Sequence, residues 1–299
     1  MNELLDFTEL QAAGLLPAPP AAVQALLPAC HDGASLAALA EALARQPRLT
    51  AGLARLAGHD GAASTAVLAA LGPAVVHQTV LGLGLLGAYR RGACGALDYP
   101  QHWSQALALA CAAQQLAGPQ EGAALFSAGL LAGCGQLGLA TVRPRSYAQL
   151  LREAGGAALL HPALLAGENA RYGHTHLELG AAMLRHWHAA APLADAIGSM
   201  DAPQQAGTAA ARRLAWQLHL AARIAEVCRA APPARADLLP EVAALGALLE
   251  LAVPALLALT ERAGLAWSRW CIALDLPCRH SPRPEGAPAI HHHAERSVP

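Results

Sequence analysis

A long uncharged run constrains the fold of this chain more than any other feature. Residues 122–142 contain no Asp, Glu, Lys or Arg, and the run ends at Glu121 and Arg143. Its length would allow it to cross a bilayer, as would those of two further uncharged runs, 61–89 and 99–120. However, all three are diluted by Ala, Gly, Gln or His, the first also carries Pro73, and none has a compact Leu/Ile/Phe stretch with flanking aromatic anchors. We therefore expect no membrane insertion and predict helices that are apolar all round because they are buried.

The same run contains the pattern G-x-G-x-x-G, at Gly133, Gly135 and Gly138. In a dinucleotide-binding loop this pattern follows a β-strand and opens a helix. Here the preceding residues, "AALFSAGLLA", are typical of a helix, and Pro144 interrupts the segment that follows. The spacing fits a dinucleotide loop but the context does not, so we predict no nucleotide cofactor.

The residue types favour helices throughout the chain. Ala and Leu recur everywhere, whereas there are only ten Val and four Ile, and aromatic residues make up 4%. Strands need β-branched and aromatic residues, and helices favour Ala and Leu, so the prediction is an all-α fold. With 55% hydrophobic residues, the chain has ample material for a large core.

Charge and cysteine usage limit the classes of partner and compartment. The net charge is −1, there is no Lys, and the Arg residues are scattered, which argues against nucleic-acid binding. The acidic start "MNELLDFTEL" is unlike a signal peptide, and the seven Cys form no C-x-x-C pair. We expect a cytoplasmic protein with reduced thiols and no structural metal.

The pattern of capping residues predicts a series of short helices. Ser35 is a predicted N-cap, Pro47 a first-turn residue, and two helices within 64–89 are expected to be separated at Gly72-Pro73. Further helices are predicted at 101–117, 123–139, 146–155, 175–188, 208–230 and 240–272. The Pro-rich segment 277–299 is predicted to be a disordered tail.

The order of these segments carries a resemblance to a known family. "LPAPPAAVQALL", "ASLAALAEALARQPRLTAGLARLAG" and "LAALGPAVVHQTVLGLGL" resemble the N-terminal lobe of the HDOD family of bacterial signalling proteins, relatives of the HD and HD-GYP metal phosphohydrolases. "HWSQALALACAAQQLA", "SAGLLAGCGQLGLA", "ENARYGHTHLELGAAMLRHW" and "LAWQLHLAARIAEV" then resemble, in order, four diagnostic segments of the HD-like lobe. The resemblance covers residues 10–265. It implies a two-lobed helical fold, with a small helical bundle at 10–95, an HD-like lobe at 98–230, and C-terminal helices at 240–272.

The resemblance also indicates where a catalytic relative would bind its metal. Catalytic HD proteins use a His, an adjacent His-Asp pair and a late Asp, and the metal activates a water molecule. These ligands fall on Gln105, on Ala132 and Gly133, and on Ala222. A second His pair of many relatives falls on residues 200–201. Because Ala and Gly offer no donor atom and a Gln amide alone is a weak ligand, we predict no catalytic residue and no metal.

Four residues of the resemblance keep their family identity: Trp103, Glu168, His176 and Trp187. They are candidate residues of the inter-lobe groove or an interaction site. For His176 the alternative is a core histidine hydrogen-bonded to a carboxylate such as Glu168, itself expected near a helix start. For each Trp the alternative is a place in the core. The remaining His of these segments, 102, 174, 186 and 188, are expected to be exposed.

These observations predict a non-enzymatic signal-transduction module. It would bind a protein partner, or a small signalling molecule, in the groove between its two lobes. Two alternatives are a divergent metal phosphohydrolase or phosphodiesterase with a relocated site built from Gln105, His176 and Asp201, and a sensor of nucleotides such as cyclic dinucleotides.

Overall fold

The protein is helical throughout the part that the structure describes. We describe a computed structural model over residues 4–30, 35–118 and 121–278. Its N-terminal part contains α1 (Phe7–Ala12), α2 (Ala21–Gln24), α3 (Leu36–Ala44), α4 (Pro47–Leu56), α5 (Thr65–Leu71) and α6 (Pro73–Ala88). The rest contains α7 (Tyr99–Leu116), α8 (Gly122–Leu131), α9 (Cys134–Val142), α10 (Pro144–Glu153), α11 (Pro162–Tyr172), α12 (His176–His186), α13 (Ala191–Gly198), α14 (Ala209–Arg229), α15 (Pro232–Leu248) and α16 (Val253–Leu274). The all-α prediction is confirmed.

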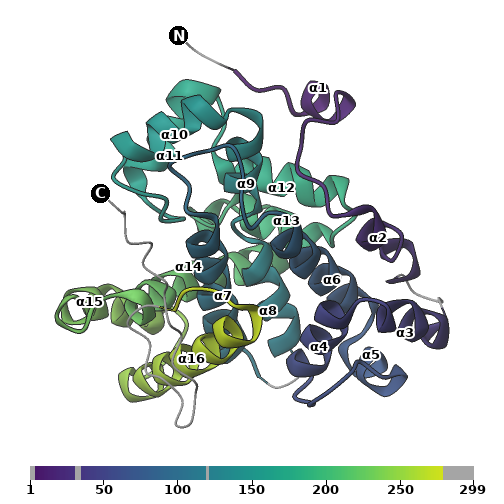
Figure 1. Cartoon of the computed structure of the whole chain (residues 1–299). Helices are drawn as coiled ribbons and strands as arrows, with labels where there is room; N and C mark the ends of the chain where they lie inside the picture. Colours follow the sequence, from purple (N-terminus) through teal and green to yellow (C-terminus); the bar gives the residue numbers. More distant parts are fainter. Residues whose placement is uncertain (1–3, 31–34, 119–120, 279–299) are drawn as a thin grey trace, which may run out of the picture.

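Local sequence signals form the N-terminal lobe as predicted. The Ser35 hydroxyl accepts the Ala38 N–H and caps α3, and Pro47 occupies the first turn of α4. Gly72 separates α5 from α6 with a positive φ of 77°, and the two helices are bent by 102°. This lobe lies on one side of the molecule in Figure 1, and α6 runs from it towards the centre of the molecule.

Helix α7 is the axis of the second lobe (Figure 1) and packs against α8, α14 and α16. The α7–α8 crossing is close because α8 presents Gly129, where an added Cβ would lie 2.6 Å from the Ala110 Cα. Neighbours on three sides bury nearly the whole helix. Its apolar sequence therefore reflects burial by other helices.

The uncharged run 122–142 forms two helices, so the predicted single helix 123–139 is wrong. Helix α8 ends at Leu131, and α9 begins at Cys134 after a turn at Ala132-Gly133. By length and apolarity Gly122–Val142 passes a test for a membrane span, but 89% of its most apolar window is buried inside the protein. Its apolarity is thus accounted for by the protein core.

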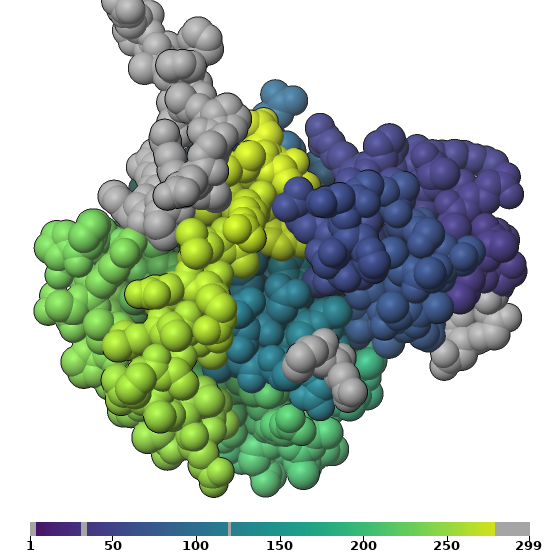
Figure 2. Space-filling view, turned by 90° about the horizontal axis from the view of Figure 1, so that it is seen from below, coloured from purple at the N-terminus to yellow at the C-terminus, as the bar shows by residue number. Residues whose placement is uncertain are grey.

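Sequence reasoning also misplaced elements near the C-terminus. The predicted helix 240–272 is two helices, α15 and α16, bent by 114° at a turn where Glu250 has a positive φ of 58°. Helices α1, α11 and α13 were missed. Figure 2 shows α16 lying between α15 and the N-terminal lobe. Its Trp270 packs on Phe126 and lies under the Arg55 guanidinium of α4, 5.6 Å from ring centroid to Cζ. The predicted tail lies outside the described residues from 279 onward.

Candidate functional site

Three of the positions matched to metal ligands meet around one small cavity. Gln105 reaches it from α7, Gly133 from the turn between α8 and α9, and Ala222 from α14. Ala132, next to Gly133, is fully buried. The cavity has a volume of about 30 Å³, which is room for about two water molecules. The fold has therefore kept the convergence of positions that the resemblance implied.

The side chains at this cavity do not fit a divalent metal. Ala132, Gly133 and Ala222 have no donor atom, and a single amide at Gln105 competes poorly with water for a cation. His102 and Glu226 also line the cavity, but the Glu226 carboxylate pairs with Arg223 at 3.1 Å. In residues 4–30, 35–118 and 121–278, no group of three or more His, Cys, Asp or Glu is arranged to hold a metal ion. Met200 is buried and Asp201 is exposed, so the later position also lacks a converging pair.

His102, Glu226 and Arg229 are the titratable side chains at the cavity, and the predicted exposure of His102 is wrong. His102 lies on α7 with 4% of its surface exposed, because its ring faces Gly133 in the turn between α8 and α9. Its Nε2 atom has no hydrogen-bond partner. Burial lowers the pKa of His102 to about 4, opposed by a hydrogen bond with Gln136, so the imidazole is neutral at physiological pH. The imidazole at the cavity is thus neutral, and it lies beside the Glu226 and Arg229 side chains that line the same cavity.

The glycines of the G-x-G-x-x-G pattern act in packing. A Cβ on Gly133 would lie 3.0 Å from the His102 Cε1, so its absence leaves room for the imidazole. A Cβ on Gly135 would lie only 1.7 Å from the backbone oxygen of His176. One on Gly138 would lie 2.8 Å from the Met183 Sδ. Gly135 and Gly138 therefore allow α9 to cross α12 in backbone contact.

Beside this cavity lies a buried polar network around Glu168. The His176 Nδ1 donates to Glu168 Oε2 at 2.7 Å, and the His176 backbone N–H donates to the same oxygen at 2.9 Å. The Tyr147 hydroxyl donates to Oε1 at 2.9 Å. Glu168 and His176 are both fully buried. The prediction of a core His176 bonded to Glu168 is confirmed. Glu168 was expected near the start of its own helix, but it lies inside α11, and its carboxylate accepts the first N–H of the next helix, α12.

The other candidate residues are placed as follows. Trp103 is 1% exposed and donates its indole N–H to the Tyr89 carbonyl at 2.8 Å, and Trp187 is 8% exposed. His174, His186 and His188 are exposed, as expected. None of these four candidates, Trp103, Glu168, His176 and Trp187, lines the hollow between the two lobes.

A larger hollow lies between the two lobes and was not located by sequence reasoning. It has a volume of about 390 Å³ and continues into a second hollow of about 170 Å³ that shares Ala74, Gln78 and Ala190. We call the two together the inter-lobe groove. Its walls come from the start of α6, from α8, from the start of α13 and from α14, and most are Ala, Val, Leu or Pro. At its edge Arg213 pairs with Glu121 at 3.0 Å.

The groove is shaped by residues whose roles have no local sequence signal. Gln78 on α6 is 7% exposed, and its side-chain oxygen accepts the Ser127 hydroxyl of α8 at 2.8 Å. This hydrogen bond joins the lobes at the groove floor. The only hint in the sequence was a polar pair inside two apolar helices.

These features define a two-lobed, all-α domain whose second lobe is built around α7. The chain belongs to the HDOD domain family, whose model matches residues 16–203. The match ends before α14, so Ala222 lies beyond it.

Solved structures show the same fold. A candidate phosphohydrolase from Shewanella amazonensis is 22% identical, with a TM-score of 0.62 over 89% of this chain and 94% of that one. The MmoQ response regulator from Methylococcus capsulatus is 30% identical, with a TM-score of 0.50 over 82% and 97%. A candidate signal transduction protein from Marinobacter aquaeolei is 18% identical, with a TM-score of 0.51 over 85% and 61%. No curated protein sequence matches the chain.

Proposed function

We propose that this protein is a non-enzymatic regulatory module of a signal-transduction pathway and that it binds a protein partner in the inter-lobe groove. One observation carries the proposal. The positions that hold metal in catalytic relatives still meet, but they are Gln, Gly and Ala around a cavity of about 30 Å³. A phosphate ester with its metal ions needs far more room and several anionic or imidazole ligands. Neighbours named as a response regulator and a candidate signal transduction protein support the regulatory role.

The groove has the composition of a protein-binding surface. Ala74, Ala124, Pro192 and Ala210 are exposed apolar residues on its walls, and Leu214 is partly buried among them. A concave apolar surface of this kind accepts the apolar face of a helix or an extended segment. Its bond across the floor, from Ser127 to Gln78, makes it sensitive to the relative position of the lobes. Binding there is therefore suited to a signalling role.

The two alternatives find less support in the geometry. A relocated metal site would need Gln105, His176 and Asp201 to converge, but the His176 Nδ1 is engaged by Glu168 and Asp201 is exposed. A cyclic dinucleotide carries two phosphates. The one guanidinium among the described groove residues is that of Arg213, which already pairs with Glu121.

A pair of matched variants tests the groove. Ala124→Glu places a charge in the groove, and Ala247→Glu makes the same change on an exposed position of α15 away from it. Proteins captured from the native cell and quantified by mass spectrometry should be lost with Ala124→Glu and kept with Ala247→Glu. If both variants capture the same proteins as the parent chain, the groove is not the binding site. If calorimetry shows saturable binding of a cyclic dinucleotide that Ala124→Glu abolishes, the sensor replaces the protein-binding module.

A further inference from the structure

The chain folds back on itself directly after α16. Asp275 adopts the left-handed conformation, with φ 52° and ψ 58°. The Leu276 N–H donates to the Cys271 carbonyl at 2.9 Å and the Asp275 N–H to the Ile272 carbonyl at 3.3 Å. These two bonds form a Schellman motif, which reverses the chain over the last helical turn. The reversal brings Cys278 back beside Cys271, and the two thiols are hydrogen-bonded to each other.

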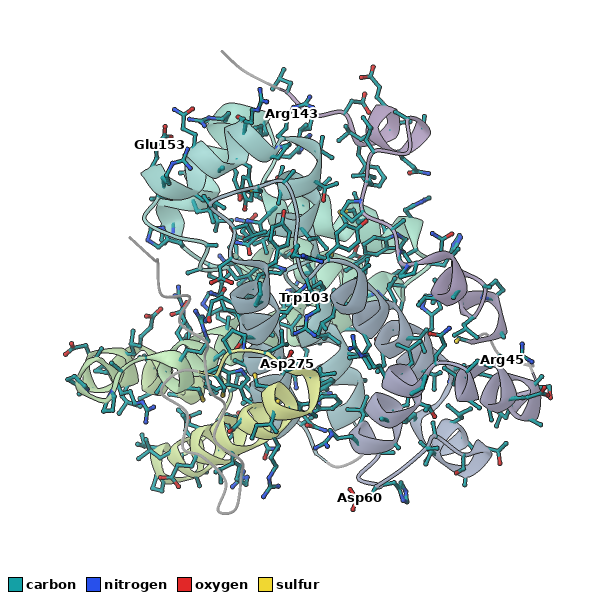
Figure 3. All side chains as sticks on the ribbon, viewed as in Figure 1. Arg45, Asp60, Trp103, Arg143, Glu153 and Asp275 are labelled. Carbon is teal, nitrogen blue, oxygen red and sulfur yellow. The ribbon has the colours of Figure 1, made fainter. Side chains whose placement is uncertain are left out.

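This turn is anchored on α7. The Ser104 hydroxyl donates to the Pro277 carbonyl and lies 3.6 Å from the Cys271 Sγ. Ser104 in turn accepts the Trp267 indole N–H at 3.2 Å. The Arg90 guanidinium donates to the Asp275 carbonyl, and Figure 3 shows Asp275 close to α7, the helix of Trp103. The two thiols are therefore held in contact by the packing of α16 and its turn.

The pair differs in access to solvent. Cys278 is partly exposed, whereas the other six cysteines are buried. A small oxidant in solution therefore reaches Cys278 first. The hydrogen bond with Cys278, together with burial, raises the pKa of the Cys271 thiol. The thiolate is the reactive form of a cysteine, and the more accessible of the two thiols is the one expected to react first.

We propose that Cys278 and Cys271 form a reversible disulfide in response to hydroperoxides, with Cys278 as the reacting thiol and Cys271 as the resolving thiol. The Cys278 thiolate attacks the O–O bond; an S–O bond forms, and water or an alcohol leaves, so that Cys278 becomes a sulfenic acid. Cys271 then attacks that sulfur, its proton passes to the departing hydroxide, and water leaves. In sum, two thiols and one hydroperoxide give one disulfide, one alcohol or water, and one water.

Two further thiols lie near the pair but are poorly placed to compete. Cys111 and Cys228 are close enough to interact electrostatically with Cys278. Both are buried, and the Cys228 Sγ is hydrogen-bonded to the Thr260 carbonyl at 3.5 Å. Cys278 is instead hydrogen-bonded to Cys271. The disulfide is therefore expected to be specific.

Peptide mapping of the full chain tests the proposal. The reduced protein is treated with hydrogen peroxide, its remaining thiols are alkylated, and the digest is analysed by mass spectrometry. Two of the seven thiols should be lost, in a Cys271–Cys278 peptide lighter by two hydrogen atoms, and dithiothreitol should restore both. Cys278→Ser should leave its six thiols unreacted. Ser104→Ala, which removes the anchor on Pro277, should slow the disulfide several-fold and let a dione probe trap the Cys278 sulfenic acid.

Several outcomes would overturn the proposal. One is a disulfide between Cys278 and either Cys228 or Cys111. Another is oxidation of Cys278 to the sulfinic acid while Cys271 remains free to be alkylated. A third is that no thiol is lost at peroxide concentrations that oxidise free cysteine. Circular dichroism of Cys278→Ser and Ser104→Ala shows whether each variant is folded. Because Cys278 is partly exposed, its replacement by Ser is expected to leave the fold intact.

Discussion

Two buried regions in the second lobe differ in the polar groups that they contain. At the small cavity the positions Gln105, Gly133 and Ala222 carry no imidazole or carboxylate, and the adjoining His102 has an unpaired Nε2. The Glu168 network is fully buried, and its carboxylate accepts three hydrogen bonds, although the His176 Nε2 is also unpaired. The difference leads us to expect that the fold depends on the carboxylate that joins α10, α11 and α12 and tolerates substitution at the cavity.

The largest effect is expected for Glu168→Ala. It leaves the Tyr147 hydroxyl and two donors of His176 buried without an acceptor, which should lower the free energy of unfolding by about 3–5 kcal/mol. Urea denaturation followed by circular dichroism measures it. The control Glu41→Ala removes a carboxylate that is mostly exposed and pairs only with Arg45, so its effect should stay below about 1 kcal/mol. Equal effects of the two variants would mean that the network is not structural.

The two neighbouring glycines should respond differently to alanine. Gly135→Ala places a Cβ against the backbone of α12 and should destabilise the protein by about 3 kcal/mol, because neither helix can move away locally. Gly133→Ala meets only the edge of the His102 ring, and its φ of −87° suits alanine, so we expect a change of less than about 1 kcal/mol. Thermal unfolding of both variants compares them. A larger effect at Gly133 would show that the cavity is the more constrained region.

His102 should make stability depend on pH. Its pKa is lowered from 6.5 to about 4 by burial, so as pH falls the unfolded chain takes up a proton before the folded one. The stability present above pH 6.5 is therefore lost as pH falls towards 4, by about 2 kcal/mol between pH 7.5 and pH 5. Denaturation midpoints of the parent chain and of His102→Gln, measured across that range, isolate this contribution. Identical pH profiles would contradict a buried, neutral His102.

The smallest effect is expected for Gln105→Ala. Gln105 is partly exposed at the edge of the cavity, and its loss strands no buried group, so stability should change by no more than about 0.5 kcal/mol. Urea denaturation, run beside Glu168→Ala, gives the most direct contrast of the two regions. A loss comparable to that of Glu168→Ala would assign Gln105 a structural role.

Local signals predicted much of this fold, and long-range packing decided the rest. Ser35, Pro47 and Gly72 mark helix ends through their own hydrogen bonds and dihedral angles, so they were readable from sequence. The turn at Ala132-Gly133 has no proline, and Ala and Leu around it continue a helical pattern. It exists because α9 packs on α12. The break before α16 did carry a local signal, Pro254 in the first turn of that helix, which the expectation of one helix over 240–272 overlooked.

The candidate site divides in the same way. The Glu168–His176 bond was foreseen because one helix stripe places the imidazole on an apolar face, where it needs an acceptor. The burial of His102 was not foreseen, because three helices cover α7 on sides that its sequence does not distinguish. The inter-lobe groove arises from helices far apart in the chain, and no local pattern of residues encodes it.

Metal binding tests the central claim most directly. The purified full chain, freed of adventitious ions, is titrated with Mn²⁺ and Fe²⁺ by calorimetry under reducing conditions and assayed for hydrolysis of a chromogenic phosphodiester before and after chelation. We expect no stoichiometric binding of either metal and no chelator-sensitive hydrolysis, because Gln105, Gly133 and Ala222 cannot replace imidazole and carboxylate ligands. Binding of one or two equivalents of metal, with hydrolysis that the chelator abolishes, would contradict it.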